Sequence, residues 1–202
     1  MDEPILHFSR EELVGRRQAA CAKMAEQGLD GLVMFRQESM YYLTGYDTMG
    51  YTMFQALYLG ADGDLALITR TADRIQSRST SVIDDIRMWY DRADATPAED
   101  LRDMLEDKGC RGKRLGIEYH AYGLTAQRGK MVDAALDGFC ETTDASDLVR
   151  LLRLVKSPAE LEYIRKAGAL CDLIFEVSVE GVKPGASTKA IFGQMVAAQM
   201  AA

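Results

Sequence analysis

The feature that most constrains the fold of this chain is an alternation of short apolar runs with amphipathic segments at helical spacing, which fills residues 10–153. The first apolar run, Leu32-Val33-Met34-Phe35, follows Asp30-Gly31 and contains no polar residue. A continuous apolar run of this length is typical of a strand that is buried on both faces of a sheet. Strands that alternate with helices in this way predict a layered α/β domain with a mixed sheet.

The expected elements follow one another in a simple order. Strands are expected over residues 32–35, 53–59, 64–69, 86–90, 114–117 and 139–142. Helices are expected over residues 10–27, 38–44, 72–78, 97–108, 124–136 and 144–153. The second and third strands are joined by Gly60-Ala61-Asp62-Gly63, whose residue types favour a hairpin turn, so these two strands should be antiparallel neighbours.

Local signals define the ends of the first two helices. Ser9-Arg10-Glu11-Glu12 has the pattern of a capping box, in which the serine hydroxyl accepts from the third helical N–H and Glu12 accepts from the serine N–H. Gly28 is expected to end the first helix, and Gly45 is expected to end the short helix that follows the first strand.

The sequence changes character after residue 144. Ser157-Pro158-Ala159-Glu160 combines an N-cap, a proline at the first helical position and a capping glutamate, and therefore predicts the start of a long helix. Lys183-Pro184-Gly185 interrupts this helix, and Ser187 can cap a second helix that runs from residue 188 to the end.

These last two helices allow two interpretations. Both have an apolar stripe at helical spacing, and no strand follows them for the stripes to cover, which suggests the beginning of a further domain. The alternative is a helical hairpin that packs back on the α/β core. We assign an α/β domain to residues 1–150 and an incomplete second domain to residues 151–202.

The charge and hydropathy of the chain exclude several kinds of partner. A formal net charge of -7 and the lack of any basic cluster argue against direct binding of nucleic acid. No apolar run approaches the roughly 20 residues that span a bilayer, so no membrane partner is expected. The N-terminus, Met1-Asp2-Glu3-Pro4, is acidic where a secretory signal would be basic, which predicts a cytoplasmic protein.

No residue of this chain is predicted to be catalytic or to bind a metal. The four cysteines are widely spaced and are interpreted as reduced packing residues. The only histidines are His7, near the N-terminus, and His120, which follows a strand in Glu118-Tyr119-His120; a lone histidine beside a carboxylate is most often a surface or structural residue, so structural roles are favoured. A phosphate-binding loop is also missing, because Gly28-Leu29-Asp30-Gly31 ends a helix and does not begin one.

Several phrases resemble the creatinase/prolidase family in the correct order. Gly28-Leu29-Asp30-Gly31-Leu32-Val33 and Met40-Tyr41-Tyr42-Leu43-Thr44-Gly45-Tyr46 are similar to two phrases of that family's N-terminal domain. Arg114-Leu115-Gly116-Ile117-Glu118 resembles a late strand of the same domain. Leu152-Arg153-Leu154-Val155-Lys156-Ser157-Pro158-Ala159-Glu160 resembles the junction with the catalytic pita-bread domain, and Val182-Lys183-Pro184-Gly185 resembles a turn between the first two helices of that domain.

The resemblance implies an architecture and a chemistry. It implies a mixed sheet flanked by helices, ribonuclease H-like in fold, followed by two helices of a truncated pita-bread domain. Full-length relatives such as Xaa-Pro dipeptidases and aminopeptidase P are homodimers that act on peptides or small amides with two divalent metals, Mn, Co, Zn or Fe. Their ligands, two Asp, one His and two Glu, would lie beyond Ala202, as would the histidine base of the metal-free creatinase branch. This chain alone would therefore be inactive.

The resemblance also singles out candidate substrate-lining residues. In dimeric relatives the stretch that corresponds to the residues after Tyr42-Leu43-Thr44-Gly45 reaches the mouth of the other subunit's active site. Here that stretch contains the candidates Tyr46, Asp47, Tyr51 and Met53. Its aromatic and polar content would suit substrate lining; a loop that packs on its own domain is the alternative. Creatinase has an arginine where this chain has Thr52-Met53, so creatine is a poor candidate substrate.

The predicted function is therefore that of a non-catalytic N-terminal domain of a metal-dependent Xaa-Pro peptidase or creatinase-like hydrolase, which contributes to dimerisation and to the substrate-site mouth. The alternative is a stand-alone binding module for a peptide or protein, as in the peptidase-like domain of the FACT histone chaperone. An unrelated nucleotide-binding α/β domain is a third interpretation, but the chain lacks its glycine-rich fingerprint.

Overall fold

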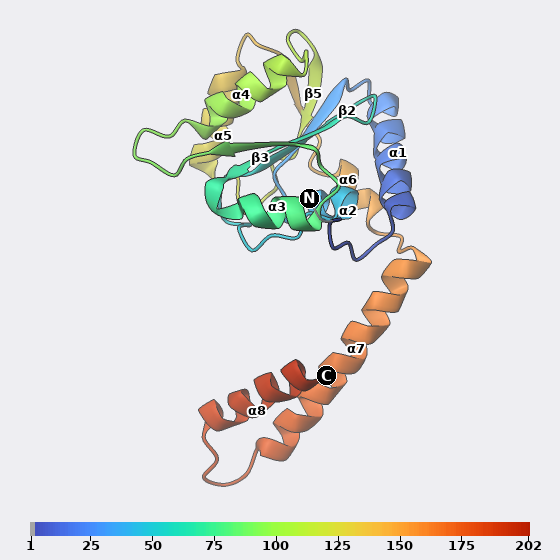
Figure 1. The fold of residues 1–202 in the computed structure, drawn as a ribbon, viewed down its shortest axis with the longest axis vertical. Coiled ribbons are helices and arrows are strands. Elements are labelled where there is room, and N and C mark those ends of the chain that lie inside the picture. Colours follow the sequence, from blue (N-terminus) through green and yellow to red (C-terminus); the bar gives the residue numbers. More distant parts are fainter. Residues whose placement is uncertain (1–2) are drawn as a thin grey trace. The chain divides into compact units, whose positions relative to one another are not determined.

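The computed structural model describes residues 3–202 and divides into two compact units, one ending at Leu154 and the other spanning Val155–Ala202 (Figure 1). Met1 and Asp2, which belong to the acidic N-terminus discussed above, lie outside the described residues. Within residues 3–202, no helix combines the length and the apolar character that a bilayer crossing requires.

A six-stranded mixed sheet forms the centre of the first unit, in the order β4-β3-β2-β1-β5-β6. The strands are β1 (Gly31–Met34), β2 (Ala56–Gly60), β3 (Leu65–Arg70), β4 (Asp85–Trp89), β5 (Arg114–Ile117) and β6 (Glu141–Asp144). β1 pairs antiparallel with β2 and parallel with β5, and β2 pairs antiparallel with β3. The β3–β4 and β5–β6 pairs are parallel. The predicted mixed α/β architecture is confirmed.

Helices cover both faces of this sheet (Figure 1). The helices of the first unit are α1 (Arg10–Glu26), α2 (Gln37–Thr44), the 3-10 turn η1 (Thr71–Asp73), α3 (Arg74–Thr80), α4 (Pro97–Asp107), α5 (Ala126–Leu136) and α6 (Leu148–Leu152). On one face, α4 and α5 bury their apolar residues against a cluster that includes Val33. On the other, α1, α2 and α6 share a second cluster with Leu32 and Met34. Successive side chains of β1 therefore enter opposite cores, as strand geometry requires.

The local signals are mostly confirmed. All four residues of β1 are buried, the turn at 60–63 joins β2 to β3, and Gly45 ends α2 in the left-handed conformation with φ 82°. Ser9 Oγ accepts from the Glu12 N–H at 3.1 Å. The prediction that the Glu12 carboxylate accepts from the Ser9 N–H is wrong, because this carboxylate instead forms an ion pair with Arg16 at 3.1 Å.

Two strands begin two or three residues later than predicted, whereas the other strands begin within one residue of the prediction. The strand expected from residue 53 begins at Ala56, because Gln55 is buried and its amide donates to the Gly50 carbonyl oxygen at 2.9 Å, which holds 50–55 as a loop. The strand expected from residue 139 begins at Glu141. Phe139 N–H still donates to the Leu136 carbonyl oxygen at 3.0 Å, so the turn that ends α5 continues through Phe139, whose ring fills the core.

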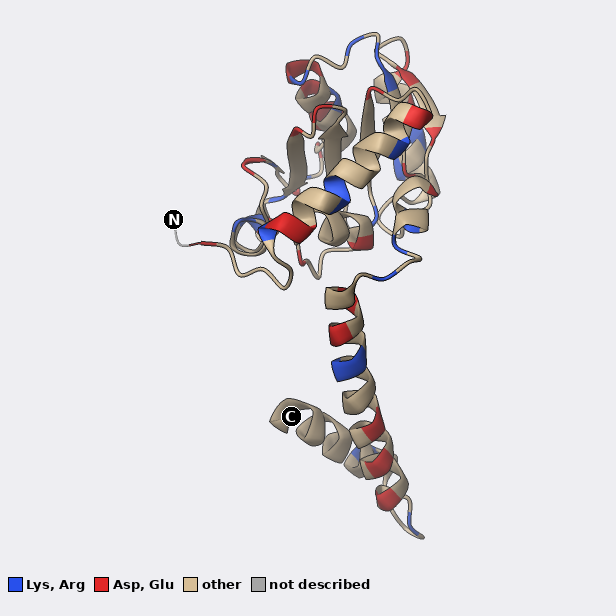
Figure 2. Cartoon of the chain, turned by 90° about the vertical axis from the view of Figure 1, so that its right-hand side faces the viewer, with Lys and Arg blue, Asp and Glu red and all other residues tan. Residues whose placement is uncertain are grey.

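The second unit consists of α7 (Pro158–Gly181) and α8 (Thr188–Ala201), which contact each other. The predicted capping box at the start of α7 is complete, with Ser157 Oγ accepting from the Glu160 N–H and the Ser157 N–H donating to the Glu160 carboxylate at 2.9 Å. None of the residues described in α7 or α8 is buried. Charged residues recur along α7, whereas α8 has few of them (Figure 2).

Candidate functional site

The candidate site lies at the edge of the sheet where the parallel strands β1 and β5 end. Three segments meet there, residues 35–38 after β1, residues 46–54 after α2, and residues 118–124 after β5. The carboxyl ends of neighbouring parallel strands form the usual place for a ligand in an open α/β sheet. Hydrogen bonds between these segments determine the shape of this edge.

Glu118 is the buried carboxylate that joins the ends of β1 and β5. It is 1% exposed, and it accepts hydrogen bonds from the Arg36 N–H at 2.9 Å and from Ser39 Oγ at 2.6 Å. Both donors lie at the start of α2, so Glu118 supplies a cap that the helix does not provide from its own N-cap residue, Arg36. Burial raises the pKa of Glu118 from its ordinary value to about 7, although both hydrogen bonds oppose the rise.

Arg36 connects the end of β1 with the segment after β5. Its guanidinium donates from Nε and Nη2 to the carbonyl oxygen of His120, the Nε contact being 2.9 Å. The His120 N–H in turn donates to Ser146 Oγ at 3.1 Å. The backbone of His120 is therefore held from both sides, which fixes the course of the chain toward Tyr122.

The loop of residues 46–54 is fixed from beneath by buried polar contacts. The Tyr46 hydroxyl donates to Gln55 Oε1 at 2.8 Å, and Gln55 Nε2 donates to the Gly50 carbonyl oxygen at 2.9 Å. A Cβ at Gly50 would lie 2.4 Å from Gln55 Nε2, so only glycine allows this close approach. Gln37 Nε2 also donates to the carbonyl oxygen of Thr48.

Arg128 holds this loop against the segment that follows β5. Its Nη1 donates to the Thr52 carbonyl oxygen at 2.6 Å and to the Gly123 carbonyl oxygen at 2.8 Å. A Cβ at Gly123 would lie 2.7 Å from the Met53 carbonyl oxygen, so the absence of a side chain lets the two segments touch. These two segments consequently have a defined position relative to each other.

Two tyrosine rings meet above this junction and border a small hollow. The rings of Tyr51 and Tyr122 lie edge to face, with centroids 6.3 Å apart and planes at 79°. The hollow beneath them has a volume of about 230 Å³ and is lined by Phe35, Arg36, Gln37, Glu38, Tyr51 and Tyr122. Its walls offer aromatic surface, one guanidinium and one carboxylate, which are groups that bind and orient a ligand.

The predicted lining residues separate into two groups. Tyr51 is 47% exposed and lines the hollow, whereas Tyr46 is fully buried in the core. Burial also raises the pKa of the Tyr46 hydroxyl, which is engaged by Gln55, so Tyr46 supports the loop from inside. Asp47 and Met53 are half-buried, and their N–H groups bond to Thr80 Oγ1 and to the Gly50 carbonyl oxygen respectively.

The sequence reasoning missed Arg36, Glu118, Tyr122 and Arg128. Arg36 and Glu118 were detectable in principle, because each is a charged residue that directly follows an apolar strand run, where a sheet edge is expected. Arg128 has no such signal, since its partners are backbone oxygens, one of the nearby Gly123 and one of Thr52, which is far away in the sequence.

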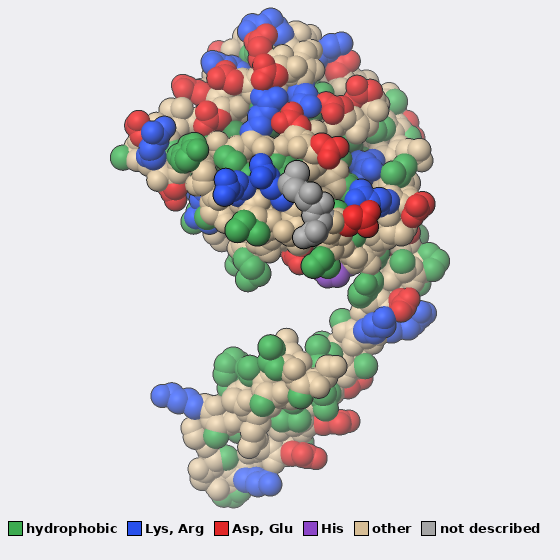
Figure 3. Space-filling view, in the orientation of Figure 1, with side chains coloured by type: hydrophobic (Ala, Val, Ile, Leu, Met, Phe, Trp, Pro, Cys, Tyr) green, Lys and Arg blue, Asp and Glu red, His purple; other side chains and the backbone are tan. Residues whose placement is uncertain are grey.

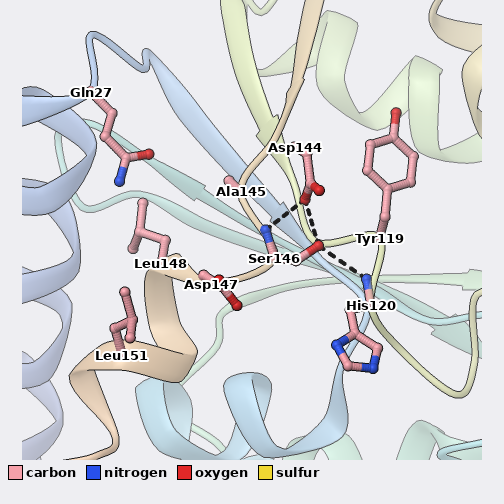
Figure 4. A pocket seen from close by; sticks show the side chains of 9 residues that line it. All are labelled: Gln27, Tyr119, His120, Asp144, Ala145, Ser146, Asp147, Leu148 and Leu151. Carbon is pink, nitrogen blue, oxygen red and sulfur yellow. Dashed lines mark hydrogen bonds between the residues drawn. The ribbon is translucent and has the colours of Figure 1, made fainter.

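A second hollow, of about 530 Å³, lies beside the ends of β5 and β6 and includes His120, Ser146 and Asp147 (Figure 4). Its polar groups bond mainly to one another, since Ser146 Oγ donates to Asp144 Oδ1 at 2.5 Å. The other histidine, His7, is bonded to the Tyr41 hydroxyl at 2.8 Å. Among residues 3–202, no three His, Cys, Asp or Glu side chains come together in a way that could hold a metal ion.

The surface shows no preference for one sign of charge on the face drawn in Figure 3. Lys and Arg side chains alternate there with Asp and Glu over the α/β unit, and apolar side chains appear between them. A protein that binds a phosphate backbone presents a continuous basic surface.

Comparison with known proteins gives a consistent result. Residues 16–155 match the Creatinase/Prolidase N-terminal domain. An uncharacterized hydrolase/peptidase of Sinorhizobium fredii is 30% identical over 203 residues, which cover 97% of this chain and 52% of the relative. Ectoine hydrolase of Halomonas elongata is 30% identical over 187 residues, 89% of this chain and 47% of the relative.

The fold is also shared with solved structures. The Xaa-Pro dipeptidase of Bacillus anthracis superposes with a TM-score of 0.70 at 18% identity, over 94% of this chain and 49% of that one. The chain thus spans about half the length of the relatives that it matches. With the match over residues 16–155 and the shared mixed sheet, the chain belongs to the creatinase/prolidase family through its N-terminal domain.

Proposed function

We propose that this chain is the N-terminal domain, with the opening helices of the pita-bread catalytic domain, of a metal-dependent hydrolase that acts on an Xaa-Pro peptide or a small amide. The supporting observations are the match of residues 16–155 to the Creatinase/Prolidase N-terminal domain and the match of nearly the whole chain to about half the length of relatives named as hydrolases or peptidases. In this proposal the α/β unit binds and positions, and the chemistry takes place in the other half of the parent protein.

The parent would use two divalent metals, Mn, Co, Zn or Fe, to supply an activated water. Such a site needs carboxylates and a histidine in one cluster, and the described residues do not provide it. His7 is engaged with Tyr41, and the polar residues around His120 bond to one another and to Arg150. The metal ligands would therefore come from the remainder of the parent protein.

The α/β unit would contribute to a homodimer and to the substrate-site mouth through the loop of residues 46–54. The loop is exposed at Tyr51 and rigid beneath it, because Gln55 and Arg128 bind its backbone. A ring presented by a fixed loop can contact a substrate without a large loss of conformational freedom on binding. Tyr51 is the residue on which this proposal is most directly tested.

Replacing Tyr51 by alanine in the full-length enzyme should raise KM for the substrate about tenfold, with kcat changed little, because the ring would contact substrate and transition state equally. Steady-state kinetics on Xaa-Pro dipeptides measures both constants. Tyr90→Ala is the matched control, since Tyr90 is 61% exposed and does not line the hollow. An unchanged KM in Tyr51→Ala would refute the role given to the loop.

The isolated chain should cleave no Gly-Pro dipeptide and bind no pair of metals. Metal content of the purified chain, by elemental analysis after equilibration with Mn²⁺, tests the second part. Tight binding of two metals would contradict the proposal. Specific peptide binding by a native protein of 22.4 kDa, the mass of this chain, would favour the stand-alone binding module instead.

A further inference from the structure

The hollow beneath Tyr51 and Tyr122 has features that the fold does not require. Tyr122 is 79% exposed and Tyr51 is 47% exposed, and their rings lie edge to face with centroids 6.3 Å apart. Leaving aromatic surface in water is unfavourable, and rigid exposed tyrosines are typical of recognition surfaces. The two rings thus offer an apolar ligand group a paired aromatic surface.

The charged groups of the hollow indicate what such a ligand carries. Arg36 has five N–H donors, of which one from Nε and one from Nη2 are used on the His120 carbonyl oxygen, so donors remain for a carboxylate. Glu38 lines the same hollow and is exposed. One positive and one negative group in so small a space disfavour a polyanion and suit a ligand with one charge of each sign.

The size of the hollow sets a limit on the ligand. Its volume of about 230 Å³ lies below the range of about 300–1,000 Å³ that is typical of pockets for drug-sized molecules. A single amino acid with a ring or branched side chain is of suitable size, whereas a longer peptide would extend beyond the walls.

The walls are positioned before any ligand arrives. Glu118 holds the Arg36 backbone, the Arg36 side chain holds His120, and Arg128 holds the two segments that present Tyr51 and Tyr122. Groups that are fixed in this way bind with a smaller entropic cost than groups that must be ordered.

We propose that this hollow binds a free amino acid with an apolar or aromatic side chain. Its carboxylate would bind Arg36, its ammonium would bind Glu38, and its side chain would lie against Tyr51 and Tyr122. This inference deepens the proposed function, because it gives a ligand class to the hollow that Tyr51 lines, and it rests on that function for its role. Arg128 is a positioning residue in this site.

The test uses the 202-residue chain and three related probes. L-Phenylalanine should bind in a saturable way, observed by calorimetry and by NMR shifts of the Tyr51 and Tyr122 rings. L-Phenylalaninamide, which lacks the carboxylate, and 3-phenylpropionate, which lacks the ammonium, should each bind at least about tenfold more weakly. Equal binding of the three probes, or no binding of L-phenylalanine up to about 10 mM, would overturn the proposal.

Substitutions in the hollow test which side chain contacts which group of the ligand. Tyr122→Ala should weaken binding of all three probes, and Arg36→Gln should abolish the preference for L-phenylalanine over its amide. Arg36→Lys keeps the charge and should retain part of that preference, which separates anion binding from a loss of fold. Tyr90→Ala, an exposed tyrosine elsewhere on the unit, should bind as the unchanged chain does. A loss in Tyr90→Ala equal to that in Tyr122→Ala would contradict the assignment.

The binding experiment and the kinetics of Tyr51→Ala distinguish a failure of this inference from a failure of the proposed function. If the chain fails to bind L-phenylalanine while Tyr51→Ala raises KM in the full-length enzyme, this inference fails and the proposed function stands. If the chain binds L-phenylalanine and Tyr51→Ala leaves KM unchanged, the loop has no substrate role and the hollow is a separate amino-acid site.

Discussion

Helices α1 and α7 begin in the same way and are buried very differently. In α1, of 17 residues, Leu13, Arg16, Ala20 and Met24 are buried, and Ser9 caps the first turn. In α7, of 24 residues, Ser157 caps the first turn with a more complete set of hydrogen bonds, yet no residue is buried. The cap and the apolar spacing therefore specify a helix in both units. The sheet buries the apolar face of α1 within the first unit, whereas α8 contacts α7 without burying any of its residues.

The same difference appears in individual large side chains of the second unit. Phe175 in α7 is 69% exposed and Phe192 in α8 is 65% exposed, although both are large and apolar. Helices that bury so little derive their stability mainly from local interactions and from each other. In the proposed parent, the remainder of the catalytic domain would cover these faces.

The largest expected loss of stability comes from a substitution in the core of the first unit. Leu67, in β3, is fully buried, and Leu67→Ala should lower the free energy of unfolding by about 3 kcal/mol, through lost burial and the cavity left behind. Urea unfolding followed by tryptophan fluorescence measures this, because Trp89 is the single tryptophan and lies in β4 of the same unit.

Phe175→Ala is the matched change in α7. It removes a larger side chain, but one that is mostly exposed, so the Trp89 transition should shift by no more than about 0.5 kcal/mol. A shift similar to that of Leu67→Ala would mean that Phe175 is buried in solution and that α7 packs on the first unit.

The next largest expected effect on stability comes from Glu118, whose contribution to the free energy of unfolding depends on pH. Its carboxyl group has a pKa of about 7 in the folded protein against an ordinary 4.5, so the folded chain binds the proton more tightly than the unfolded chain does. Stability from this group is therefore greatest at low pH and falls as the pH rises from about 4.5 through 7. Between pH 5 and 7.5 the loss amounts to about 2 kcal/mol.

Glu118→Gln removes the titrating group and keeps a hydrogen-bond acceptor for the Arg36 N–H. Between pH 5 and 7.5, the free energy of unfolding should fall by about 2 kcal/mol less in the variant than in the unchanged chain. Urea unfolding at several pH values measures this difference. The hydrogen bonds that Glu118 accepts come from the Arg36 N–H and from Ser39 Oγ, and both donors are unchanged in the variant. Parallel pH profiles for the two chains would show that Glu118 is already ionised at low pH.

Most of the fold was predictable because its signals are local. The strand at Leu32-Val33-Met34-Phe35, the turn at 60–63 and the caps at Ser9 and Ser157 each depend on residues close in sequence. The late start of β2 had a cause that single-residue propensities do not contain. Gln55 is held in the loop by contacts with Gly50 and Tyr46 that no propensity encodes.

The site was predictable only in part for the same reason. The resemblance to the family located the loop that carries Tyr51, but it could not tell that Tyr46 points into the core and Tyr51 toward a hollow. The opposite wall comes from residues after β5, and Tyr122 becomes a neighbour of Tyr51 only through Arg128 and the bare backbone of Gly123. Pairings of this kind appear only when the strands are ordered in the sheet.

The two serine caps give the smallest and most discriminating test of the comparison. Ser9→Ala and Ser157→Ala each remove a side-chain acceptor from a first helical turn, which costs about 1 kcal/mol in either helix. In α1 this cost belongs to the unit that contains Trp89, so the urea midpoint of the Trp89 transition should fall. In α7 it should appear only as faster amide exchange over residues 158–162.

Serine-to-glycine changes at the same positions are the matched controls, because glycine at an N-cap costs only a few tenths of a kcal/mol. If Ser157→Ala lowers the Trp89 midpoint as much as Ser9→Ala does, the two units unfold together and α7 is stabilised by the sheet after all. If only Ser9→Ala does so, the stability of α7 is independent of the α/β unit.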